Sequence, residues 1–349
     1  MIDFRYHLVS IVAVFLALAI GIVLGSTELQ GNTIDVLRTS SNLLKNELDQ
    51  SNAERNTATQ QYNTGQTFIT TAEPRLLANE LPGHRIVLVT EPGASSSVIT
   101  GITKAAKLAG ATVTGEVAIQ PKFNDLSGTT QSSLSQINSD LASTDGTSLA
   151  TPSNQQTLNQ QQAAQLIGTA ILATTTAGET TGLSTADATT LLGAYAQAGY
   201  ITITPAVTDR ATLAVIVTPD TAPADGQNDP GTQVLLAMAQ EFAGESAATV
   251  VVGSTAGSSS AGSPIGVLRA RSVASLVSTV DNADAIIGQV STIWALAEQL
   301  RGQKPNSYGI SGASAVSPVP LPMPSATPTI SPSPHATQTG KGDKSVKKK

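Results

Sequence analysis

The chain has 349 residues, of which 3% are aromatic and 13% are charged, with a formal net charge of −6 and no cysteine. The absence of cysteine excludes a disulfide framework, thiolate metal sites and a cysteine nucleophile. A negative net charge offers nucleic acid no basic surface, so we exclude nucleic-acid binding.

The first predicted element is an apolar helix near the N-terminus. Residues 8–24 form a run of seventeen residues without a charge, and Ser10 is its one hydroxyl. As a helix this run covers roughly 25 Å, close to the hydrocarbon thickness of a bilayer. It lacks the polar face that a helix packed against the core of a globular protein would have. We therefore interpret residues 1–26 as a transmembrane anchor.

A cleaved signal sequence is the alternative for the same segment. Ala17-Leu18-Ala19 provides a small-residue exit site, but residues 8–16 then form a short apolar region. We favour the anchor and leave cleavage open. Arg5 precedes the run and indicates a cytoplasmic N-terminus. The chain is then a single-pass protein of the cell membrane or envelope, with its C-terminal domain extracytoplasmic.

Residues 27–73 are predicted to form a helical stalk. Ile34, Leu37, Leu44 and Leu48 have the a/d spacing of a heptad repeat. The same frame places further residues on this seam: Ser41, Ser51, Arg55, Ala58, Tyr62, Gly65 and Ile69. A single amphipathic helix and a short parallel coiled coil both fit. We favour the coiled coil, because anchoring raises the local concentration, and expect a homo-oligomer formed through residues 30–72.

Pro74 and Pro82-Gly83 are predicted to separate the stalk from an extracytoplasmic domain over residues 82–310. Short apolar runs predict strands at 85–89, 112–119, 200–203, 211–217 and 249–252. Helical patterns alternate with them at 98–109, 132–142, 155–173, 185–198, 232–243 and 287–300. This alternation predicts an α/β fold with a mostly parallel, Rossmann- or flavodoxin-like sheet and helices on both faces.

Two Gly- and Ser-rich loops follow predicted strands and are candidate ligand sites, at residues 91–97 and 253–263. Backbone N–H groups at such a strand exit can hold an anion. Neither loop has the glycine spacing of a dinucleotide or Walker motif. Because every parallel α/β fold has ordinary loops at these places, a small-ligand binder ranks last among our functional hypotheses.

The candidate catalytic residues do not form a recognised constellation. His84 is the single histidine of the predicted domain and begins a strand, where we expect an edge or solvent-facing role. Asp281, Asp284 and Glu298 are candidates for paired carboxylates, but the spacing of the first two favours a turn or helix cap. No G-x-S-x-G motif is present. We predict no enzyme and assign no catalytic, cofactor-binding or metal residue.

Residues 311–349 are predicted to be a disordered tail. The segment is rich in Pro, Ser and Thr, and five lysines stand against Asp343. Such a composition lacks the apolar surface needed for a core.

The residues at the two ends of the predicted folded region resemble those of a known family. Residues 3–10, DFRYHLVS, and 13–26 resemble the start of the actinobacterial copper transport protein B family of copper transport outer membrane proteins. Residues 277–281, the helix carrying Trp294 and residues 307–309 resemble its C-terminal end. The resemblance spans residues 2–310. Relatives often have a histidine before the Tyr-Gly pair, where this chain has Ser307.

The resemblance implies an envelope protein of copper homeostasis, described for the family as a channel-forming outer-membrane component. It also implies a link to cell division, through control of peptidoglycan hydrolysis at the septum. We therefore expect a role in copper efflux or envelope permeability. The alternative is an anchored coiled-coil scaffold that regulates a cell-wall hydrolase or division partner.

The residues themselves limit how the chain could handle copper. Soft copper sites use Cys, Met or His, and the three methionines are Met1, Met238 and Met323. A dedicated copper cage within one chain is therefore not expected. Short apolar strands separated by helices also differ from the long alternating strands of a membrane barrel. A pore would then require oligomerisation, and inner or outer membrane stays open.

Overall fold

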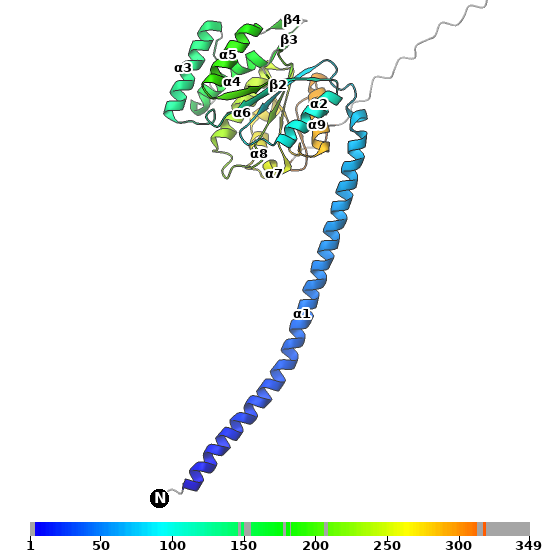
Figure 1. Cartoon of the computed structure of the whole chain (residues 1–349), viewed down its shortest axis with the longest axis vertical. Helices are drawn as coiled ribbons and strands as arrows, with labels where there is room; N and C mark the ends of the chain where they lie inside the picture. The colour runs from blue at the N-terminus through cyan, green and yellow to red at the C-terminus, as the bar shows by residue number, and fades with distance from the viewer. Residues whose placement is uncertain are drawn as a thin grey trace, which may run out of the picture.

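The computed structural model describes residues 4–145, 148–149, 155–176, 179–181, 183–205, 209–312 and 317–318. Its first element is α1, Phe4–Leu77, a single helix of 74 residues. At 1.5 Å per residue, a helix of this length extends for about 110 Å. Figure 1 shows it projecting away from a compact domain, with the N-terminus at its far end. The prediction for residues 311–349 falls outside the described residues except at 311–312 and 317–318.

The first part of α1 is the predicted apolar helix. The segment Arg5–Ser26 is long and apolar enough to cross a membrane, with a mean hydropathy of 2.9 and none of it buried in the molecule. Its large apolar side chains point outward, as Phe15 does with 67% of its surface exposed. Such a surface is stable in lipid and unfavourable in water.

Pro74, predicted with Pro82-Gly83 to mark the domain boundary, lies inside α1, which runs on to Leu77. Proline removes one backbone N–H and disfavours a helix interior. Packing offsets that cost here, since Glu73, Leu77 and Leu81 are fully buried against the domain. The last turn of α1 therefore belongs to the folded domain.

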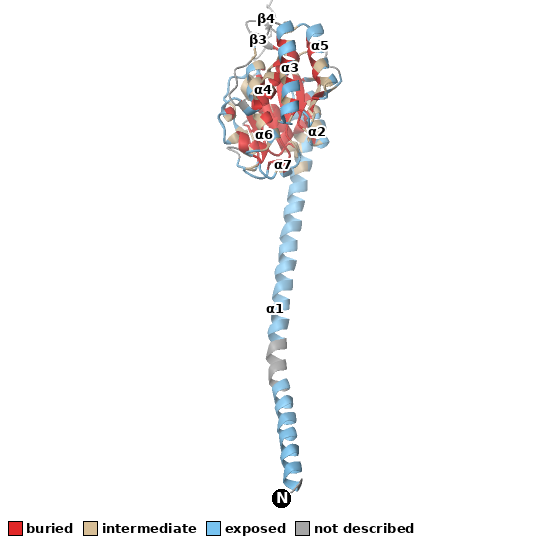
Figure 2. Ribbon diagram, turned by 90° about the vertical axis from the view of Figure 1, so that its left-hand side faces the viewer, coloured by how far each residue is buried: buried red, intermediate tan, exposed pale blue. Residues whose placement is uncertain are grey.

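Over residues 35–65, between anchor and domain, α1 is exposed to solvent (Figure 2). Several large apolar side chains lie on this part, with more than half of their surface exposed: Val36, Leu37, Leu43, Leu44 and Leu48. Exposed apolar residues at heptad spacing are what a coiled coil would bury. The coiled coil stays a prediction.

The domain is built on a seven-stranded sheet with the order β5-β2-β1-β6-β7-β8-β9. The strands are β1 Arg85–Thr90, β2 Thr112–Ile119, β5 Ile201–Thr204, β6 Leu213–Val217, β7 Ala248–Val252, β8 Ser278–Val280 and β9 Ser307–Tyr308. All neighbours pair in parallel except β2 and the edge strand β5. A small hairpin, β3 Thr174–Thr176 with β4 Glu179–Thr181, lies outside this sheet. The predicted mostly parallel α/β fold is confirmed.

Helices cover both faces of the sheet. The larger ones are α2 Ser96–Leu108, α3 Gly128–Asp145, α4 Leu158–Ile171, α5 Thr185–Gln197, α6 Pro230–Glu245 and α9 Ile286–Leu300. Short helical segments complete the set: η1 Gln155–Thr157, α7 Thr255–Ser258, α8 Pro264–Arg269 and η2 Ser272–Ser275.

The alternation of side chains along each strand divides the core into two clusters. Val87 and Val89 of β1 pack on the face covered by α4, α5 and α6, whereas Ile86 and Leu88 pack on the face covered by α2 and α9. Because both faces of a central strand pack against an apolar cluster, its sequence is a continuous apolar run. That is why sequence reasoning found β1, β6 and β7. It missed β8 and β9, which are three and two residues long and carry polar side chains.

Three side-chain contacts fix the end of α1 against α2 and α9. Trp294 Nε1 donates to the Leu76 carbonyl at 3.1 Å, and Arg301 pairs with Glu80 at 2.9 Å. Lys104 Nζ lies 2.6 Å from the buried Glu73 carboxylate. The end of the long helix and the turn that follows it therefore pack directly against the domain.

Candidate ligand-binding cavity

The sheet has a topological switch point between β1 and β6. The chain passes from β1 through α2 to β2 on one side, and later from β6 through α6 to β7 on the other. The two connections therefore diverge at the carboxyl ends of β1 and β6. In open α/β sheets a ligand crevice commonly lies at this place.

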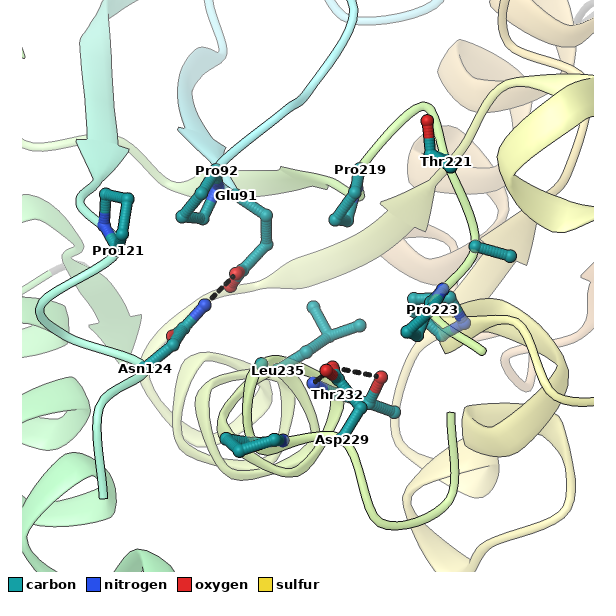
Figure 3. Close-up of a pocket in the computed structure, with 14 residues that line it drawn as sticks. Glu91, Pro92, Pro121, Asn124, Pro219, Thr221, Pro223, Asp229, Thr232 and Leu235 are labelled. Carbon is teal, nitrogen blue, oxygen red and sulfur yellow. Dashed lines mark hydrogen bonds between the residues drawn. The ribbon is translucent and has the colours of Figure 1, made fainter. Parts of the chain in front are cut away.

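A cavity of about 450 Å³ occupies this position. Glu91 and Pro92 line it directly after β1, Pro121 and Asn124 after β2, and Pro219 after β6. The start of α6 closes the remaining side. Figure 3 shows these side chains converging from four segments that lie far apart in the sequence.

Glu91 is the central polar group of the cavity. Its side chain reaches from the end of β1 toward the start of α6 (Figure 3), and the residue is 4% exposed. Its Oε2 accepts from Asn124 Nδ2 at 3.2 Å, while its buried Oε1 has no hydrogen-bond partner. Burial raises the pKa of the Glu91 carboxyl to about 7, and the nearby charge of Asp229 acts in the same direction.

The start of α6 faces Glu91 and carries its own carboxylate. Asp229 caps the helix, and its Oδ2 accepts from the Thr232 N–H at 2.8 Å and from the Thr232 hydroxyl at 3.0 Å. Asp and Pro are common at the first positions of a helix. The Asp229-Pro230-Gly231-Thr232 sequence carries this signal, but sequence reasoning did not connect it with a site.

The two candidate loops have different outcomes. The first residues of 91–97, Glu91 and Pro92, line the cavity. In the loop 253–263 two serine side chains accept hydrogen bonds from nearby backbone N–H groups. Ser254 caps α7 by accepting from the Gly257 N–H, and Ser263 caps α8 by accepting from the Gly266 N–H. Its hydroxyl groups satisfy local N–H groups in the way short helix caps do.

His84 lies at the opposite end of the sheet from the cavity. It precedes β1, a central strand, so of the predicted edge or solvent-facing role only the edge position is contradicted. The residue is half-buried, and its Nδ1 lies 3.5 Å from the Thr212 hydroxyl. Burial and the Arg85 charge lower the pKa of the imidazole.

The structure separates the three candidate carboxylates by their partners. Asp284 binds the N–H and hydroxyl of Thr255, so it caps α7 as a turn residue would. Glu298 accepts from the Tyr308 hydroxyl. Among the described residues, no group of three or more His, Cys, Asp or Glu side chains is placed to hold a metal ion.

The interpretation of Asp281 as a turn or cap residue is wrong. Asp281 is fully buried and forms an ion pair with Arg269, with 2.8 Å between Nη1 and Oδ2. It also accepts from the N–H groups of Ile310 and Ser311 at 2.7 and 2.8 Å. Arg269 comes from α8, a segment the sequence reading left unassigned, so this pairing is a product of the tertiary fold.

Similarity to known proteins identifies the family. A family model described as "Copper transport outer membrane protein, MctB" matches residues 1–320. The chain belongs to the MctB family. It is 30% identical over 321 residues to a protein named Copper transporter MctB from Mycobacterium tuberculosis (strain H37Rv), covering 91% of this chain and 98% of the relative.

Other MctB proteins match this chain with similar identity and coverage. The Mycobacterium bovis protein gives the same identity and coverage, and the Mycobacterium leprae protein is 30% identical over 323 residues, or 99% of its length. The MctB match therefore includes the apolar helix, the long stalk and the whole sheet domain. The resemblance stated from the sequence, over residues 2–310, is confirmed.

Proposed function

We propose that this chain takes part in copper homeostasis in the cell envelope, through copper efflux or envelope permeability and without enzymatic activity of its own. The observation that carries the proposal is the match to proteins named Copper transporter MctB over 91% of the chain. The apolar segment Arg5–Ser26 supports a membrane location. In this proposal the N-terminus is cytoplasmic and the sheet domain extracytoplasmic, and the outer-membrane location named in the family description is the alternative.

The chemistry of the domain supports an indirect role in copper handling. The polar groups of the cavity are carboxylates, an amide and hydroxyls, which suit hard cations better than copper. We therefore assign copper movement to an assembly containing several copies of the chain or a further envelope protein.

Deletion of the gene from its host tests this proposal. The deletion strain should accumulate more copper and stop growing at lower external copper, because an efflux or permeability function is lost. Cell-associated copper is measured by mass spectrometry, with zinc as the control metal. Re-expression of the full chain should restore the copper content, and a chain without residues 5–26 should not. Unchanged copper content in the deletion strain would contradict the proposal.

A second function, an anchored scaffold for a cell-wall hydrolase or division partner, is favoured by one observation. The part of α1 outside the anchor exposes apolar side chains at heptad spacing, including Leu37, Leu44 and Leu48. A helix with such a stripe gains stability when a second helix covers it. In this proposal the chain forms a homo-oligomer through residues 30–72 and presents the paired stalk to the partner.

Disulfide cross-linking tests the paired stalk, because the natural chain has no cysteine. Leu44→Cys places a thiol on the proposed seam, and Asn46→Cys places one on the outer face of the same helix turn. In membranes, mild oxidation should convert most of the Leu44→Cys chain to a dimer on a non-reducing gel. Equal cross-linking of both variants would show random collision and would count against the coiled coil.

A further inference from the structure

The cavity at the switch point contains a buried acceptor whose bonding within the protein is incomplete. Glu91 Oε2 accepts from Asn124, whereas Oε1 has no partner although the residue is 4% exposed. A buried carboxylate oxygen without a donor is costly, and proteins rarely retain one without a reason. When the carboxyl is ionised, a group that satisfies Oε1 by hydrogen bonding must carry an N–H or O–H donor.

The charges around the cavity determine which donors fit. Glu91 and Asp229 are its acidic lining residues, and no Lys, Arg or His is among the described residues that line it. The carboxylates lie near each other, since the charge of Asp229 acts on Glu91. A cation is therefore attracted to the cavity and an anion is repelled.

The start of α6 does not provide an anion site. Pro230 has no N–H, and the N–H groups of Thr232 and Gln233 donate to the side chain and carbonyl of Asp229. A helix start binds phosphate through free N–H groups and its positive dipole. Because Asp229 already occupies this position, the cavity lacks the feature that phosphate recognition needs at such a switch point.

The walls of the cavity are apolar and rigid. Six prolines line it: Pro92, Pro121, Pro219, Pro223, Pro230 and Pro264. Leu235 adds an aliphatic side chain from α6 (Figure 3). Proline rings have few conformations, so little conformational entropy is lost when a ligand packs against them. A volume of about 450 Å³ suits a small organic molecule.

We infer that this cavity binds a small organic amine as its ammonium cation, with the Glu91 carboxylate accepting from the ammonium group and the proline rings packing against its apolar body. The inference is independent of the copper proposal, since it rests on the cavity alone.

Three probes with one apolar body test the inference: 2-phenylethylamine, 2-phenylethanol and 3-phenylpropanoate. The full chain in lipid nanodiscs is titrated with each by calorimetry at pH 7.5, and empty nanodiscs are subtracted. The amine should bind saturably with one site per chain, at least tenfold more tightly than the alcohol, and the carboxylate should not bind. Equal affinities, a preference for the carboxylate, or no saturable amine binding would overturn the inference.

A matched pair of variants locates the binding. Glu91→Gln keeps the shape of the side chain and removes its charge, and it should weaken amine binding at least tenfold. Glu245→Gln changes a half-buried carboxyl at the C-terminal end of α6, outside the cavity, and should leave affinity unchanged. Folding of both variants is checked by circular dichroism. Unchanged affinity in Glu91→Gln would overturn the assignment.

Proton release gives a second readout. Burial raises the pKa of the Glu91 carboxyl to about 7, so most of it is protonated at pH 6. Binding of an ammonium ion there should expel this proton, whereas Asp229 stays engaged by Thr232. The binding heat at pH 6 should then depend on the ionisation enthalpy of the buffer, and this dependence should disappear in Glu91→Gln. A buffer-independent heat in the natural chain would contradict the role of Glu91.

Discussion

Replacing Glu91 with Gln should make the stability of the protein less dependent on pH. Burial raises the pKa of this carboxyl from 4.5 to about 7 in the folded state, so between these values the folded protein binds more protons than the unfolded chain. Stability of the natural protein therefore falls as the pH rises from 4.5 through 7. The shift corresponds to a loss of about 3 kcal/mol once Glu91 is fully ionised.

The measurement is urea unfolding of the full chain in detergent at pH 5, 6, 7 and 8, for the natural protein and Glu91→Gln. The stability difference between the two should move in favour of the variant by about 2.5 kcal/mol across this range. Glu245→Gln is the control, since burial also raises the pKa of that half-buried carboxyl and its removal should have a smaller effect. A difference in stability between the natural protein and Glu91→Gln that does not change with pH would contradict a burial-raised pKa for Glu91.

Replacing Arg269 with Met should destabilise the domain strongly. The guanidinium lies 2.8 Å from Asp281 and donates to the Thr279 hydroxyl and to the carbonyls of Tyr308 and Ser311. Without it, Asp281 stays fully buried with its charge uncompensated. Removing one partner of a buried ion pair typically costs about 3–5 kcal/mol. The segment from Tyr308 to Ser311 should also loosen, since Arg269 donates to the carbonyls at both of its ends.

Chemical unfolding measures the loss, and hydrogen exchange at residues 306–311 measures the loosening. Arg271→Met is the matched control, because Arg271 is exposed two residues away and such surface changes stay within about 0.5 kcal/mol. The double variant Arg269→Met/Asp281→Asn should recover part of the stability, since no unpaired charge is then buried. A loss below about 1 kcal/mol in Arg269→Met would contradict a structural role for the pair.

Sequence reasoning found one of the segments that line the candidate cavity. The loop beginning at Glu91 was predicted because it follows a buried strand, and parallel sheets place such loops at one edge. Asn124 and Asp229 were not predicted as partners of Glu91, although both approach it. Their spacing along the chain holds no motif, and they meet only when β2 and α6 pack beside β1.

The roles of the acidic residues after β8 were likewise only partly predictable from the sequence. The spacing of Asp281 and Asp284 favours turn and cap roles, and this was right for Asp284. For Asp281 the decisive fact is an arginine from α8 and complete burial. Local spacing cannot reveal desolvation, because that depends on every segment packed around the group.

The sequence by itself determined the apolar helix at residues 8–24, the central strands and the family. Each of these depends on hydropathy, on periodicity or on matching residues in order, which are properties of the linear chain. Tertiary structure decided that α1 continues through Pro74 into the domain, that Asp281 is an ion-pair residue and that Glu91 lies in a proline-walled cavity. These features arise from pairing and burial among distant residues, whose energies exist only after the sheet has assembled.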